Sequence, residues 1–82
     1  RLCGLLLDSA VAADAGDQLQ ANGKEAGRIT SSVISPQLGR PIALGYVMKE
    51  HWEPGTELSL RHSGANIRAK VVKLPFPQRP LE

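Results

Sequence analysis

The stretch ELSLRHSGANIRAKVVKL, residues 57–74, decides the fold of this chain. In residues 57–62 two leucines alternate with polar side chains, and in residues 67–74 apolar side chains again alternate with arginine and lysine. A period of two places successive side chains on opposite faces of a β-strand. Because residues 63–66 (SGAN) have the composition of a tight turn, the stretch predicts a β-hairpin with one apolar face.

The chain outside this hairpin has the same character. Its apolar segments predict further strands at residues 2–8, 18–21, 25–35 and 42–48. Asn22-Gly23 indicates a hairpin between two of them, because a type I′ turn needs positive φ at both central residues. Residues 35–41 are predicted to be a loop, since two prolines and a glycine do not fit inside a ladder. Residues 9–15 and 49–55 are predicted to be connections.

These segments together predict an all-β fold, a small antiparallel barrel of about six strands. Closure is favoured because it removes exposed strand edges. A length of 82 residues indicates one domain, which we place at residues 1–80, with Leu81-Glu82 interpreted as a possible tag remnant. So small a core leaves little room for a deep cavity, and we expect any ligand site on a face or at a domain junction.

Composition argues against a nucleic-acid partner and a membrane partner. Ten basic and eight acidic residues give a net charge of only +2, and the one basic cluster, Arg68, Lys70 and Lys73, is interpreted as a solvated strand face. An oligonucleotide-binding barrel, kept as a weak alternative, would need more stacking platforms than Tyr46, Trp52 and Phe76.

Cellular location is predicted from two simple observations. No apolar run approaches the ~18 residues of a membrane helix. The single cysteine excludes an intrachain disulfide and fits a reducing, cytoplasmic location. Among the aromatic residues, Phe76 is expected to close one end of the barrel, and Trp52 is expected to cap a rim or meet a partner domain.

The sequence predicts no catalytic residue and no metal site. Cys3 lies in an apolar segment and is expected to be a buried structural thiol. His51 and His62 flank polar turns, and no Gly-x-Ser-x-Gly motif is present to hold a nucleophile. Two isolated histidines and one cysteine do not make a zinc ligand set, and Asp14-x-x-Asp17 is too short for a calcium loop. On its own, the chain is therefore expected not to be an enzyme.

One longer pattern is more specific. Residues 27–47, GRITSSVISPQLGRPIALGYV, resemble the C-terminal barrel domain of the aminomethyltransferase family, the glycine-cleavage T-protein and its relatives. The family pattern there is Gly-x-(Val/Ile)-Thr-Ser, then Ser-Pro-x-Leu, then Ile-Ala-x-Gly-Tyr-Val. The agreement extends to residues 1–5, 54–58 and 69–76, so the resemblance covers nearly the whole chain in one order.

The resemblance implies a protein of three domains around a central hole in which tetrahydrofolate binds, with this barrel as one wall. It implies a reaction that moves the one-carbon unit of an aminomethyl-lipoyl carrier to tetrahydrofolate and releases ammonia. The implied partners are the upstream catalytic domains of the same chain and a lipoyl carrier protein. Because the family's catalytic aspartate and most folate contacts lie upstream, no catalytic residue is carried over to this chain.

Two basic residues are candidates for the folate contact. Arg40 lies in the proline loop and could pair with a carboxylate of a folate tail or of an adjoining domain, the alternative being a solvent-exposed loop arginine. Arg79 follows the closing Pro-Phe, a position from which family members reach the folate region, the alternative being a tail residue without a role. Residues 30–32 (Thr-Ser-Ser) are expected to tie the strand end to the proline loop, and Gly45 to admit a neighbouring backbone.

One departure from the family pattern leaves the branch open. Ser32 stands where many T-proteins have glycine after Thr-Ser, which permits a paralogue. The alternatives are a non-catalytic folate-binding branch associated with iron–sulfur protein maintenance and a folate-dependent demethylating oxidoreductase. The diagnostic cysteine motif of the first branch would lie upstream of Arg1.

Overall fold

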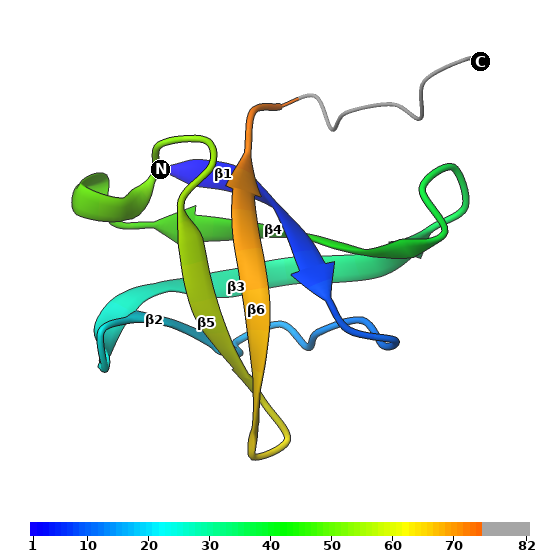
Figure 1. The fold of residues 1–82 in the computed structure, drawn as a ribbon, viewed down its shortest axis with the longest axis horizontal. Helices are drawn as coiled ribbons and strands as arrows, with labels where there is room; N and C mark the ends of the chain where they lie inside the picture. The colour runs from blue at the N-terminus through cyan, green and yellow to red at the C-terminus, as the bar shows by residue number, and fades with distance from the viewer. Residues whose placement is uncertain (75–82) are drawn as a thin grey trace.

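The computed structural model describes residues 1–74, so the expectations placed on Phe76 and Arg79 lie outside it. The elements in chain order are β1 (Leu2–Asp8), β2 (Gln18–Ala21), β3 (Lys24–Ser35), β4 (Arg40–Val47), the 3-10 turn η1 (Lys49–His51), β5 (Glu57–His62) and β6 (Ala65–Val72) (Figure 1). Neighbouring strands are antiparallel and close into a barrel in the order β1-β4-β3-β2-β5-β6. The predicted six-stranded antiparallel barrel is therefore confirmed.

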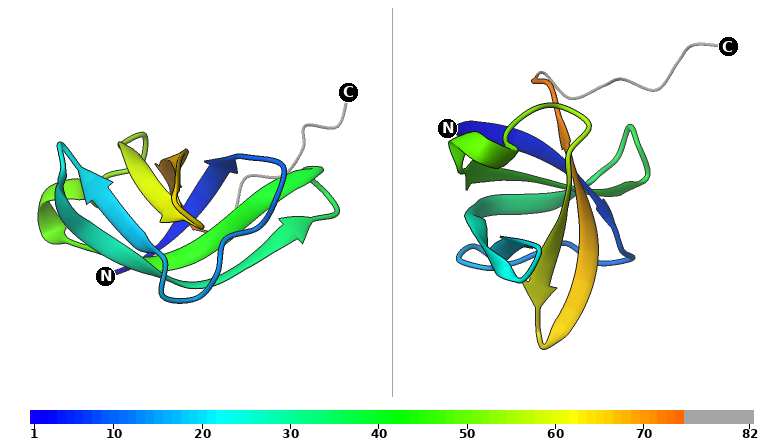
Figure 2. Two further views of the ribbon diagram at one scale, coloured as in Figure 1. Left: turned by 90° about the horizontal axis from the view of Figure 1, so that it is seen from below. Right: turned by 60° about the vertical axis from the view of Figure 1, so that its left-hand side comes forward.

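Both predicted hairpin turns are present, but the second is limited to Ser63-Gly64, because Ala65 and Asn66 already belong to β6. Asn22 and Gly23 have φ values of 53° and 78°, and Ser63 and Gly64 have φ values of 51° and 81°. Positive φ at both central positions is the type I′ geometry, whose twist matches that of the flanking strands. Figure 2 shows the strands arranged around a common centre, with the β5–β6 hairpin projecting from it at its turn.

The proline loop is shorter than predicted. β4 begins at Arg40, and Pro41 pairs with Ile34 of β3 inside the ladder. The pairing of β1 with β4 extends only to Ile42, so β4 is an edge strand at Pro41, the position in a sheet where proline is tolerated. Residues 49–51, predicted as part of a plain connection, form a 3-10 turn closed by His51 N–H donating to the Met48 carbonyl at 2.9 Å. No helix among residues 1–74 is long and apolar enough to cross a membrane.

The core lies inside the barrel, and every strand contributes inward side chains to it. The buried apolar residues are Cys3, Leu5, Leu7, Ala13, Leu19, Ala26, Ile29, Ala43, Val47, Leu58, Leu60, Ala69 and Val71. The alternation in residues 57–62 is confirmed, because Leu58 and Leu60 are buried between outward polar neighbours. Each fully buried leucine contributes about 1.5–3 kcal/mol of burial free energy. The cysteine is a free, buried thiol, as expected.

A bulge and two glycines shape the contact between β3 and β4. The register shifts between Ile29 and Ser31, which leaves Thr30 as the extra residue of a β-bulge. At this point the two backbones approach closely: a Cβ on Gly45 would lie 2.8 Å from the Arg28 carbonyl oxygen, which confirms the role predicted for Gly45. A Cβ on Gly27 would overlap the carbonyl oxygen of Tyr46, a constraint that the pattern alone did not indicate.

Candidate functional site

Arg40 stands at the first position of β4, and its side chain turns toward the end of β1. Its Nη2 donates a hydrogen bond to the Leu7 carbonyl oxygen at 3.1 Å, while the residue as a whole remains exposed. A guanidinium carries five N–H donors, so this bond fixes the position of the group and leaves other donors available. Arg40 is thus an exposed cation that is partly anchored at the start of β4. It can pair with a planar carboxylate through two parallel bonds.

The loop before Arg40, residues 36–39, is held by Ser35, the last residue of β3. Ser35 Oγ accepts a hydrogen bond from Leu38 N–H at 3.2 Å, and the Ser35 carbonyl accepts one from Gly39 N–H at 2.8 Å. These bonds close a compact turn, and Arg40 follows it as the first residue of β4. The role expected of residues 30–32 was wrong, because their hydroxyls bond elsewhere. Thr30 Oγ1 and Ser32 Oγ donate to the β4 carbonyls of Leu44 and Ile42, at 3.0 and 2.7 Å, so they tie β3 to β4 rather than to the proline loop. Ser32 Oγ also accepts a 3.0 Å hydrogen bond from Ala13 N–H in the β1–β2 connection.

A polar cluster that was not predicted joins the β1–β2 connection to the end of β5. His62 Nδ1 lies 2.7 Å from Asp17 Oδ2 and 3.7 Å from Asp14 Oδ2. The same Asp17 oxygen accepts a 2.9 Å hydrogen bond from Asp14 N–H. The Asp17 carboxylate therefore stabilises its own turn through Asp14 N–H and also contacts His62 at the end of β5. His62 is not isolated, contrary to the premise of the sequence argument, and the expectation of no metal site stays a prediction.

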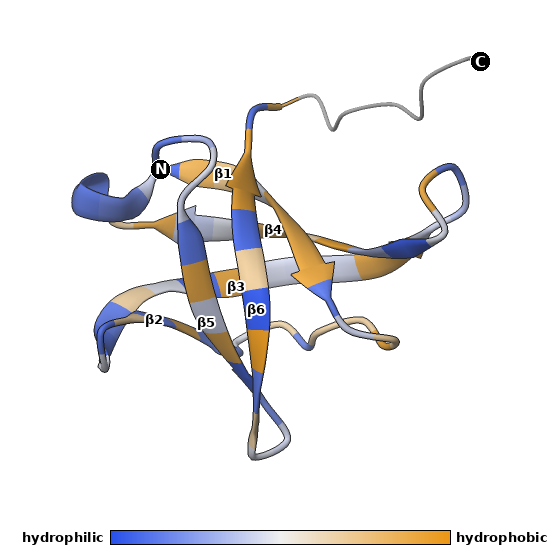
Figure 3. Cartoon of the chain, in the orientation of Figure 1, coloured by the Kyte–Doolittle hydropathy of each residue, from blue (hydrophilic) through white to orange (hydrophobic). Residues whose placement is uncertain are grey.

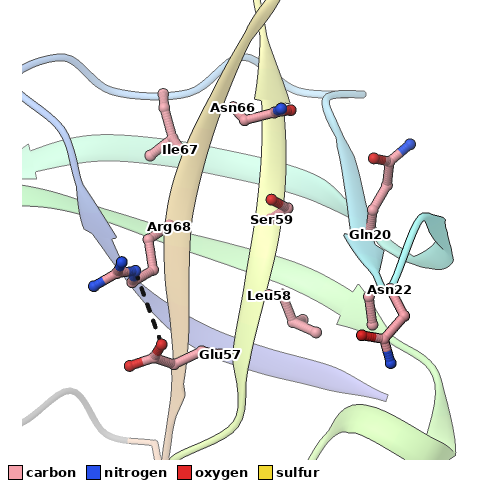
Figure 4. A pocket seen from close by; sticks show the side chains of 9 residues that line it. Gln20, Asn22, Glu57, Leu58, Ser59, Asn66, Ile67 and Arg68 are labelled. Atoms are coloured by element: carbon pink, nitrogen blue, oxygen red, sulfur yellow. Dashed lines mark ion pairs between the residues drawn. The ribbon is translucent and has the colours of Figure 1, made fainter.

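A wide polar groove crosses the outer side of β2, β5 and β6. Its volume is about 400 Å³, and its walls include Gln20, Ser59 and Asn66 (Figure 4). Arg68 Nε and Glu57 Oε1 lie 3.8 Å apart at its edge, and both side chains are more than half exposed. An exposed pair of this kind contributes little to stability. The groove offers amides, hydroxyls and an ion pair, which is the composition of a solvated face rather than of a nucleophile with its base.

Trp52 lies at the opposite end of the barrel from Arg40. It is half-buried and packs against the core, and the Arg1 guanidinium carbon lies 5.3 Å from the centre of its ring. Such an arrangement is a cation–π contact. Both side chains line a groove of about 340 Å³ that Cys3 also lines. The expectation that Trp52 caps a rim is consistent with this packing.

Among the candidate residues, only Arg40 can be placed. Arg79 is outside the described residues, so the structure does not bring the two arginines together or separate them. The contact of Arg40 with Leu7 joins residues 33 positions apart and could not be inferred from a pattern. The same holds for Asp17 and His62, which are 45 positions apart.

Comparison with known proteins gives one consistent result. The family model described as "Glycine cleavage T-protein C-terminal barrel domain" matches residues 1–77. The chain is 44% identical over 80 residues to an aminomethyltransferase of Saccharopolyspora erythraea, covering 96% of this chain and 22% of that protein. It is 46% identical over 76 residues to a probable aminomethyltransferase of Natronomonas pharaonis, covering 93% of this chain and 21% of that protein.

A solved structure agrees with these relatives. The glycine cleavage system aminomethyltransferase T of Bartonella henselae superposes with a TM-score of 0.84 at 32% identity, over 99% of this chain and 23% of that one. The chain therefore spans about a fifth of the length of the proteins it matches. These matches give no support to the two alternative branches.

Proposed function

Because this chain belongs to the glycine cleavage T-protein family, as its C-terminal barrel domain, we propose that its parent protein is an aminomethyltransferase. The observation that carries the proposal is the identity of 44% to a named aminomethyltransferase across almost the entire chain. In this proposal the barrel performs no bond-making step of its own. The catalytic groups belong to the part of the parent that the match does not span.

We place tetrahydrofolate as the one-carbon acceptor of the parent, with the barrel as one wall of its site. Folates end in glutamate carboxylates, and a guanidinium is the side chain best matched to a carboxylate. Arg40 fits this requirement, because its bond to Leu7 holds the side chain in place without using all of its donors. Arg79 is the second proposed contact, and it lies outside the described residues. The aminomethyl donor is proposed to be a lipoyl carrier protein, and the location to be cytoplasmic, which the free thiol of Cys3 supports.

The test is a calorimetric titration of tetrahydrofolate into the full-length parent and its Arg40→Ala variant. Loss of a charge-assisted pair costs about 1.5–3 kcal/mol, so the dissociation constant is expected to rise roughly 10- to 100-fold. The matched control is Arg61→Ala, which removes an exposed arginine from β5 and is expected to leave the affinity unchanged. Equal affinities for all three proteins, with each one folded by circular dichroism, would remove Arg40 from the folate site.

The activity itself is tested separately. The full-length parent is incubated with an aminomethyl-lipoyl carrier and tetrahydrofolate, and released ammonia is measured. Ammonia release that requires both components is the expected result. A parent that binds tetrahydrofolate but releases no ammonia would refute the aminomethyltransferase assignment and leave the folate wall standing.

A further inference from the structure

The outer side of the barrel has one apolar face. Cross-strand partners lie on the same side of a sheet, so the registers of β1 with β4 and of β4 with β3 define rows of outward side chains. The large apolar members of these rows are Leu2, Leu6, Val33, Ile42, Leu44 and Tyr46. The same rows contain Gly4, Ser31 and Arg28. These nine residues are called the apolar face here, and Arg28 is its one charged member.

The rest of the outer surface has the opposite character. The outward residues of β2, β5 and β6 include Gln20, Glu57, Ser59, Arg61, Arg68 and Lys70, called the polar face here. Figure 3 shows the contrast, with blue bands across β5 and β6 and a mostly orange β1. An antiparallel sheet with one side in water normally has polar outward residues, as the polar face does. The apolar face departs from this rule on three adjacent strands.

The apolar face is large enough to be an interface between domains. One outward position covers about 4.8 Å by 6.8 Å of sheet, so nine positions cover roughly 300 Å². Inter-domain interfaces begin at about 600 Å² counted over both partners, which is about 300 Å² on each. The most exposed of its large apolar members are Val33 at 59% and Tyr46 at 58%. A shallow groove of about 100 Å³ between Val33 and Leu44 could receive an apolar side chain.

The geometry points to the apolar face as the surface on which the preceding part of the full-length chain packs, an inference that rests on the proposed function. The matched family unit is a C-terminal barrel, and this chain spans only 22% of a relative, so most of such a protein precedes it. The preceding chain would join at Arg1, whose carbonyl accepts a 2.9 Å bond from Val47 N–H. Arg1 is thus fixed beside Leu2 and Tyr46, at one corner of the apolar face. The polar face then remains in water.

The test measures the reactivity of introduced thiols in the full-length parent. Ser31→Cys and Tyr46→Cys place a thiol on the apolar face, and Ser59→Cys and Arg61→Cys place one on the polar face. The Ser31 and Ser59 variants are a matched pair, each changing a single atom. Labelling by N-ethylmaleimide is followed by peptide mass spectrometry, and each rate is divided by the rate of the same peptide in denaturant.

We expect labelling at positions 31 and 46 to be at least about tenfold slower than at positions 59 and 61, because the reagent reaches a covered thiol only when the interface opens. Equal rates at all four positions would overturn the inference. Slow labelling at all four would overturn it too, because the polar face would then also be covered. If Tyr46→Cys does not fold, the matched serine pair decides the result.

The outcome is separable from that of the proposed function. A parent that protects positions 31 and 46 but does not bind tetrahydrofolate would refute the folate wall and support the packing surface. A parent that binds tetrahydrofolate while position 31 reacts as fast as position 59 would refute the packing surface alone.

Discussion

Replacement of Gly45 by alanine tests the close approach of β3 and β4. The new Cβ would lie 2.8 Å from the Arg28 carbonyl oxygen and 3.2 Å from a methyl carbon of Leu5, whereas ordinary contact begins at 3.4 Å. The methyl of Leu5 can move, but the carbonyl belongs to a backbone held in the ladder. Relief therefore requires β3 and β4 to separate next to the bulge. Overpacking of this kind costs about 1–3 kcal/mol.

The measurement is thermal unfolding of the 82-residue chain and its Gly45→Ala variant, followed by circular dichroism. A loss of about 1–3 kcal/mol corresponds to a fall in melting temperature of roughly 5–20 °C for a domain of this size. Ser31→Ala is the control on the same pair of strands, because its side chain is exposed and its change is expected to lie within about 0.5 kcal/mol. If Gly45→Ala is as stable as the control, the strands do not approach as closely as the reasoning requires.

Two further predictions concern contacts away from this crossing. Ser63→Asn is expected to stabilise the chain by about 0.5–1 kcal/mol, because Ser63 has a φ of 51° and asparagine tolerates that conformation better. Thermal unfolding measures the effect, and a lower melting temperature for the variant would contradict the prediction. A double-mutant cycle of Asp17→Ala and His62→Ala is expected to give a coupling energy of about 1 kcal/mol, since both side chains are more than four-fifths buried. Strictly additive losses of stability would show that the 2.7 Å contact between them contributes nothing.

The strands and hairpins were predictable because their determinants are local. The alternation of leucine with polar residues in residues 57–62 fixes which side faces the core, whatever lies opposite. Asn22-Gly23 likewise favours its turn through the conformations of those two residues alone. The exception is Pro41, which was predicted to lie in a loop outside the ladder. Its place in β4 depends on where the pairing with β1 stops, and that is a property of another strand.

The candidate site was less predictable, because its contacts join distant parts of the chain. Arg40 is a predicted candidate because of its place in the proline loop, and no pattern puts its guanidinium on the Leu7 carbonyl. His62 and Asp17 meet only because the barrel brings the end of β5 beside the β1–β2 connection. The bulge at Thr30 could not be predicted from the sequence either, since threonine is common in regular strands. Each of these depends on register between strands, which side-chain alternation restricts but does not set.

The closed ring also constrains the order in which the chain can fold. β1 pairs with β6, with Gly4 opposite Val72, so the first strand gains its second neighbour only when the last strand is available. The β5–β6 and β2–β3 hairpins need only short loops, whereas this pairing must first overcome the entropy of closing nearly the entire chain. During synthesis one edge of the leucine-rich β1 remains unpaired until its neighbour β6 has left the ribosome. We expect ring closure to be the slow step of folding, and this interval to be the period of greatest aggregation risk.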